Sequence, residues 1–167
     1  MNELLTLATH AAHEAGAFIR ANFGTELNVN EMQKYDIKLE LDVRSQALIT
    51  DLILKTFPEH AILGEEGGEI GGQGDVEWII DPIDGTRNFV MGIPHFCISI
   101  ACVQRDKLQH AIIVDPILGE EFVASKGAGA QLNGNRIRVR PRANLDGATV
   151  SLSCAGLRNY DQMMELQ

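Results

Sequence analysis

Apolar residues recur at helical spacing in the first part of the chain. Between about Asn2 and Asn22 they fall every three or four positions, which predicts one long amphipathic helix. A second two-faced pattern starts at Asp42, a residue type suited to the helix N-cap, and Pro58 ends it because proline cannot continue a helix. The less regular residues between the two helices, 25–41, are expected to form an extended segment or a mobile hairpin.

From residue 61 onward the pattern changes to short apolar runs separated by turn signals. Such spacing is typical of a meandering sheet with mostly antiparallel neighbours, and two long helices are enough to cover one of its faces. The expected strands are 61–63, 78–80, 96–103, 110–114, 121–124, 130–132, 136–139 and 148–152. The sequence therefore predicts the α+β class and a single domain over residues 1–167.

One short segment, D-P-I-D-G-T, follows the apolar run 78–80 directly. Pro82 cannot donate a ladder hydrogen bond, so the strand is expected to stop near Asp81 and leave two carboxylates in a loop at the sheet edge. Asp81 and Asp84, with a backbone carbonyl between them, could share a hard cation such as Mg²⁺, which prefers oxygen ligands.

The two residues after Asp84 add a second chemical feature. Gly85 and Thr86 would open the next turn with backbone N–H groups placed to hold a phosphate. The alternative interpretation is a plain turn with an acidic N-cap, and the motif taken alone is compatible with both. A further pair of acids, Glu65 and Glu66, also follows an expected strand end.

Composition and charge narrow the class of protein. The 167 residues are 45% hydrophobic and 22% charged, which is enough to build a buried core. Twenty-three acidic residues against 14 basic ones give a formal net charge of −9, which argues against gripping nucleic acid through its phosphates. Cys97, Cys102 and Cys154 have no paired spacing, so we expect a reducing, cytoplasmic compartment. We expect no signal peptide and no membrane span.

Several motifs in series resemble the inositol monophosphatase family of Mg²⁺-dependent, lithium-sensitive phosphatases. They are G-E-E at residues 64–66, D-P-I-D-G-T-R-N-F at 81–89, G-I-P-H-F at 92–96 and G-A-G-A-Q-L-N-G at 127–134. The resemblance covers the whole chain in order. It implies the N-terminal, metal- and phosphate-binding part of a sugar-phosphatase fold, with the second αβ half missing from residues 1–167.

The resemblance also implies a metal-ligand set for Mg²⁺. The ligands would be Glu65, Asp81, the carbonyl of Ile83, Asp84 and, for a more weakly held ion, Asp42. Family members usually carry a hydroxyl residue where this chain has Lys38, and a lysine at that position is expected to weaken the loosely held ion.

The same resemblance implies roles in catalysis and substrate binding. Thr86, hydrogen-bonded to a carboxylate such as Asp42, would orient the attacking water, and Glu65 would join them as a catalytic residue. Gly85, Thr86 and Asp84 would contact the substrate phosphate. Phosphoryl transfer needs mainly charge neutralisation and alignment, which these residue types can supply.

These roles imply a phosphomonoesterase that hydrolyses inositol monophosphate or a related sugar phosphate by in-line attack of a metal-activated water. Family members continue into a further segment with another metal-ligating aspartate, so residues 1–167 alone are expected to turn over poorly. We expect a small-molecule phosphate monoester as partner, a homodimer, no membrane and no direct contact with nucleic acid. The alternatives are a regulatory or assembly protein acting with RNA-handling machinery, and an inactive scaffold.

Overall fold

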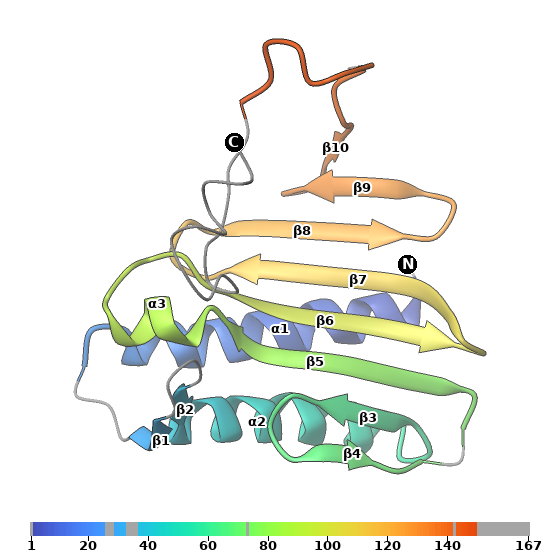
Figure 1. Cartoon of the computed structure of the whole chain (residues 1–167). Helices are drawn as coiled ribbons and strands as arrows, with labels where there is room; N and C mark the ends of the chain where they lie inside the picture. The colour runs from blue at the N-terminus through green and yellow to red at the C-terminus, as the bar shows by residue number, and fades with distance from the viewer. Residues whose placement is uncertain (1, 26–28, 33–36, 73, 142, 150–167) are drawn as a thin grey trace, which may run out of the picture.

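Two helices lie side by side on one face of an eight-stranded sheet in the computed structural model of the chain (Figure 1). The structure describes residues 2–25, 29–32, 37–72, 74–141 and 143–149. Helix α1 (Glu3–Asn22) packs on the middle of the sheet, and helix α2 (Glu40–Thr56) packs on α1 and on strand β5. This arrangement confirms the predicted α+β class.

The sheet runs in the order β10-β9-β8-β7-β6-β5-β3-β4. Its described neighbours are antiparallel except for β3 and β5, which pair in parallel. The strands are β3 (Ala61–Gly64), β4 (Gly68–Ile70), β5 (Val76–Asp84), β6 (Cys97–Gln104), β7 (Lys107–Asp115), β8 (Glu120–Ser125), β9 (Gly129–Leu132) and β10 (Asn135–Ile137). A third helix, α3 (Thr86–Val90), follows β5.

The irregular segment between the two long helices contains a hairpin, which was one of the two predicted forms. Strands β1 (Val29–Met32) and β2 (Ile37–Leu39) pair antiparallel as a separate two-stranded sheet. Strand β4 was not predicted. The strand expected over 148–152 is absent at 148 and 149, where a backbone bond from Ala148 N–H to the Leu145 carbonyl closes a turn, and its other residues lie outside the described part.

The prediction that Asp42 caps the second helix is wrong. Helix α2 begins at Glu40 because β2 leads directly into it, and this places Asp42 inside the first helical turn. A negative charge there still interacts favourably with the helix dipole. Asp42 is only 2% exposed, so it is a buried carboxylate at the start of the helix and not a surface cap.

Helix α1 presents a face of small residues to α2 and the sheet, which lets the backbones approach closely. Its N-cap is Asn2, whose side-chain oxygen accepts the N–H of Leu4 at 2.9 Å. The buried residues of the helix are Ala8, Ala11, Ala12, Ala15, Gly16 and Ile19. No helix in the described residues has both the length and the apolar character needed to cross a membrane.

Trp78 lies at the centre of the core and is fully buried on β5. Its indole Nε1–H donates to Nδ1 of His60 at 3.0 Å, and the His60 ring stacks on Phe57 with centroids 4.5 Å apart. Because Nδ1 accepts this bond, the neutral imidazole must carry its proton on Nε2. Burial lowers the pKa of His60 below its ordinary value, while the nearby charge of Glu59 opposes the shift.

This contact predicts a loss of stability in mild acid. A histidine with a lowered folded-state pKa binds more protons when unfolded, so its contribution is present above pH 6.5 and is lost as the pH falls. We expect the free energy of unfolding in urea to fall more between about pH 7 and about pH 5 in the wild type than in His60→Gln. The exposed His10→Gln is the control, and an equal fall in all three proteins would contradict the prediction.

Candidate functional site

Strand β5 does not stop near Asp81 as predicted. It continues to Asp84, and both aspartates pair with β6, Asp81 with Ser99 and Asp84 with Cys97. Between these two pairs β5 advances by three residues while β6 advances by only two. The extra residue of β5 forms a β-bulge that contains Pro82. A bulge needs no ladder donor from its extra residue, so the strand can pass a proline there.

The bulge brings the two aspartates to one site. In a regular strand residues three apart point to opposite faces, and an extra residue breaks this alternation. The charge of Asp84 acts on the Asp81 carboxyl, as expected for side chains that share a region. The predicted link between these two carboxylates therefore has a structural basis in the bulge.

Glu65 reaches the same edge of the sheet from β3. Parallel strands end at the same side, and the N–H of Glu65 donates to the carbonyl of Ile80 on β5 at 3.1 Å. The Glu65 side chain is hydrogen-bonded to the Asp81 carboxyl. Both line a pocket of about 390 Å³ that also includes Ser99 and Ala101 of β6. The structure thus brings together the two acids that were predicted to follow separate strand ends.

The electrostatics of the site are those of crowded carboxyl groups. Burial, the hydrogen bond and charge of Glu65, and the charge of Asp84 together raise the pKa of Asp81 to about 7. The N–H of Ile83, which donates to Asp81 Oδ1 at 3.2 Å, partly opposes this shift. Cys97, whose Sγ is 3.8 Å from Asp84 Oδ2, has its pKa raised to about 12 by burial and by these carboxylates.

Two further predicted residues lie at the start of helices beside this edge. Helix α2 packs on β5 and carries the buried Asp42 in its first turn, one turn before Gln46, which contacts the backbone of Glu66 after β3. Thr86 opens α3, and its hydroxyl donates to the carbonyl of Ile83 at 2.9 Å. That carbonyl is the predicted backbone ligand, so the structure joins these two members of the predicted set.

Gly85 occupies a position that only glycine fits well. Its φ of 97° is left-handed, and a Cβ there would lie 2.9 Å from the carbonyl oxygen of His95. The amide of Asn88 donates to the same carbonyl at 2.8 Å. The turn after Asp84 is therefore held closely against the segment that leads into β6.

The carboxylates are not gathered into a complete metal cluster. Within the described ranges, no group of three His, Cys, Asp or Glu side chains is arranged to hold a metal ion. What is present is a hydrogen-bonded carboxyl pair, Glu65 and Asp81, with Asp84 as a charged neighbour.

Gln46 is a residue that sequence reasoning missed. It lies on α2, is 5% exposed, and its carboxamide oxygen accepts the N–H of Glu66 at 2.8 Å while its Nε2 donates to the Glu66 carbonyl. The contact requires Gly64, because a Cβ at that position would lie 2.2 Å from Gln46 Nε2. A glutamine inside a helix carries no local signal of such a role. Gln46 positions the turn that presents Glu65.

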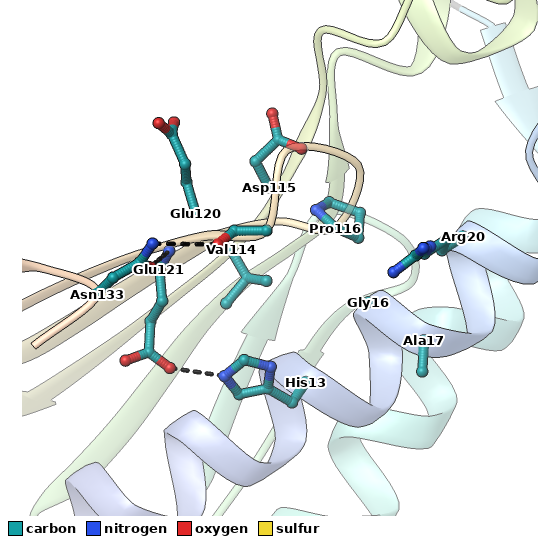
Figure 2. A pocket seen from close by; sticks show the side chains of 11 residues that line it. His13, Gly16, Ala17, Arg20, Val114, Asp115, Pro116, Glu120, Glu121 and Asn133 are labelled. Atoms are coloured by element: carbon teal, nitrogen blue, oxygen red, sulfur yellow. Dashed lines mark hydrogen bonds and ion pairs between the residues drawn. The ribbon is translucent and has the colours of Figure 1, made fainter.

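A second cavity, of about 370 Å³, lies between α1 and the β7–β8 turn (Figure 2). His13 Nε2 and Glu121 Oε2 are 2.6 Å apart across it, and the Asn133 side-chain oxygen accepts the N–H of Glu121 at 2.7 Å. None of the predicted site residues lines this cavity. These contacts connect α1 to the outer strands of the sheet.

The arrangement of two helices on one face of a mostly antiparallel sheet matches the N-terminal part of solved structures of the inositol monophosphatase fold. Residues 1–163 match the inositol monophosphatase family, and the chain belongs to this family. The resemblance noted in its motifs is thereby confirmed.

The relatives carry two kinds of name. The chain is 45% identical over 153 residues to Nus factor SuhB of Pseudomonas aeruginosa. The aligned region covers 89% of this chain and 56% of the relative. It is similar to the structure of extragenic suppressor protein suhB from Bartonella henselae (TM-score 0.81, 34% identity, 86% of this chain and 56% of that one). It is also similar to an IMPase from Thermotoga maritima (TM-score 0.78, 39% identity, 85% and 56%). The chain therefore spans little more than half the length of the proteins it matches.

The contact between Gln46 and Glu66 predicts a measurable effect on the site. In Gln46→Met the side-chain volume is largely kept but both hydrogen bonds to Glu66 are lost, so we expect a destabilisation of about 1–2 kcal/mol. We also expect faster hydrogen exchange at the Glu66 amide, measured by NMR. Gln109→Met, which removes a hydrogen bond at the surface, is the matched control. Unchanged exchange at Glu66 would rule out the positioning role.

Proposed function

We propose that the protein containing this chain is a regulatory or assembly factor that works with RNA-handling machinery. The observation that carries this proposal is the 45% identity, over 89% of the chain, to a protein named Nus factor SuhB. The similar suhB structure from Bartonella henselae adds support at the level of the fold. The comparisons favour this role over the phosphatase role that the motifs alone put first.

We also propose that the same protein retains a phosphomonoesterase site for inositol monophosphate or a related sugar phosphate. The geometry supports this second role, because Glu65 and Asp81 meet at the shared end of β3 and β5 beside Asp84. The similarity to an IMPase from Thermotoga maritima points the same way. The two roles are compatible, since one depends on a local carboxylate site and the other on a surface.

The residue types at the strand ends suit a hard cation such as Mg²⁺. All candidate donors are oxygens, and Asp81 is partly buried beside the charges of Glu65 and Asp84, which a cation would offset. The proposed ligands are Glu65, Asp81, the Ile83 carbonyl, Asp84 and, more weakly, Asp42. When bound, Mg²⁺ would neutralise phosphate charge and lower the pKa of a water molecule.

The neighbouring residues have roles of their own in this proposal. The Thr86 hydroxyl, now donating to the Ile83 carbonyl, would orient the attacking water with help from Asp42. The backbone N–H groups of Gly85 and Thr86 would contact the substrate phosphate, and these contacts strengthen as charge develops. Glu65 would act with them as a catalytic residue. A homodimer is proposed for the complete protein.

The phosphatase role predicts that Asp84→Asn in the full-length protein loses activity. Removal of one carboxylate weakens cation binding, so we expect kcat/KM for inositol 1-phosphate with Mg²⁺ to fall by about 100-fold or more. Asp75→Asn is the control, because Asp75 is an exposed partner of Arg105 far from the motif. Phosphate release at a near wild-type rate by Asp84→Asn would exclude the proposed ligand set.

The regulatory role predicts association that does not depend on the carboxylates. We expect the tagged full-length protein to copurify with RNA polymerase from its own cells, and Asp84→Asn to copurify equally well. Quantitative mass spectrometry against an untagged strain measures both. No enrichment of polymerase subunits would refute this role. It would not affect the phosphatase role, which the activity of Asp84→Asn tests separately.

A further inference from the structure

The charge of the chain is divided unevenly along its length. Residues 122–145 contain five basic residues, Lys126, Arg136, Arg138, Arg140 and Arg142, and no acidic residue. The whole chain nevertheless has a formal net charge of −9, so the remainder is strongly acidic. Local asymmetry of this kind, unlike net charge, is a signal for an anionic partner.

The described arginines of this region lie in and directly after strand β10, Arg136 within it and Arg138 and Arg140 beyond its end. Strand β10 pairs with β9 and, in the described structure, is the outermost strand on the side away from β4 (Figure 1). Arg136, Arg138 and Arg140 are exposed, and the intervening Val139 is 93% exposed. No ion pair joins any of the three to an acid among the residues that the structure describes. We call these three residues the basic edge.

Arg138 shows how the basic edge is held. Its Nη1 donates to the backbone carbonyl of Ile137 at 2.8 Å, and a Cβ at Gly129 would lie 2.9 Å from the same nitrogen. The guanidinium therefore lies over the bare backbone of β9, close to the turn that carries Lys126. A guanidinium has five N–H donors, so this one contact leaves most of them for a ligand.

The chemistry of the edge favours a repeating anion. Arginines at every second position of an extended chain recur about every 7 Å, which suits a row of phosphates better than a single one. The planar guanidinium binds phosphate in a bidentate manner. The only aromatic residue within 122–145 is Phe122, on β8, so base stacking is not the main contribution and binding should be independent of sequence.

We propose that the basic edge binds the phosphate backbone of single-stranded RNA. The choice of RNA rests on the proposed regulatory role, whereas the charge argument is independent of it. The expectation of no nucleic-acid contact was drawn from the net charge, which averages an acidic region and a basic one. A membrane surface is a weaker match, because Val139 is the only exposed apolar side chain within the edge.

The experiment measures binding of a fluorescent RNA of about 20 nucleotides and mixed sequence to the chain by anisotropy. We expect a Kd of about 10⁻⁴ to 10⁻⁶ M at low salt and a slope of about −2 for log K against log salt, as three phosphate contacts give. In Arg136→Gln/Arg138→Gln/Arg140→Gln we expect binding to weaken by about 10-fold or more and the slope to approach zero.

The matched control is Arg20→Gln/Lys55→Gln/Lys107→Gln, which removes three exposed positive charges elsewhere. It should bind RNA within about twofold of the wild type, and thermal melting should find both triple variants folded. Equal losses in the two triple variants, or no saturable binding by the wild type, would overturn the proposal. Tighter binding of polyglutamate than of RNA would overturn it in favour of an acidic protein partner.

The RNA-binding experiment and the copurification experiment can fail independently of each other. If polymerase copurifies with the full-length protein but RNA binding does not depend on the basic edge, this inference fails and the regulatory role stands. If RNA binding depends on the basic edge and polymerase does not copurify, the regulatory role fails and the inference about the surface stands.

Discussion

The parallel pairing of β3 with β5 is the constraint on which the site depends. Parallel neighbours end at the same edge, so Glu65 meets Asp81 although the two are well separated in sequence. Helix α2 precedes β3 and packs on the neighbouring strand β5, and from there Gln46 holds the backbone of Glu66, next to Glu65. If β3 ran in the opposite direction, every residue would be unchanged but the carboxyl pair could not form.

The helices and most strands could be predicted from sequence because each buries its apolar residues on one face. The period of apolar residues located both long helices and most strands. That Glu65 and Asp81 share one site was implied by the family resemblance of their motifs. The rest depends on tertiary contacts. Strand β5 continues past Pro82 because the proline lies in a bulge, where no ladder donor is needed. Helix α2 begins before Asp42 because β2 leads directly into it. Gln46 has its role only because the backbone of Glu66 lies opposite it.

The distribution of charge over the sheet is more informative than the net charge of the chain. The acids that follow β3 and end β5 lie on one side of the sheet, and the basic edge lies beyond β9, with β6 to β9 between them. Opposite charges kept apart in this way do not neutralise each other, since solvent screens them within about 10 Å. A single fold can thus carry a cation-attracting end and an anion-attracting edge, while its net charge describes neither.

The contact between Glu65 and Asp81 makes the site sensitive to pH. Burial, the contact with Glu65 and the charge of Asp84 raise the pKa of Asp81 to about 7, so this carboxyl holds a proton below neutrality. The proton removes one negative charge from a region where carboxyl groups lie close together. If the proposed cation binds here, it has to displace this proton, so its affinity would rise with pH through neutrality. Protons from the surrounding solution would then compete with the cation for the site.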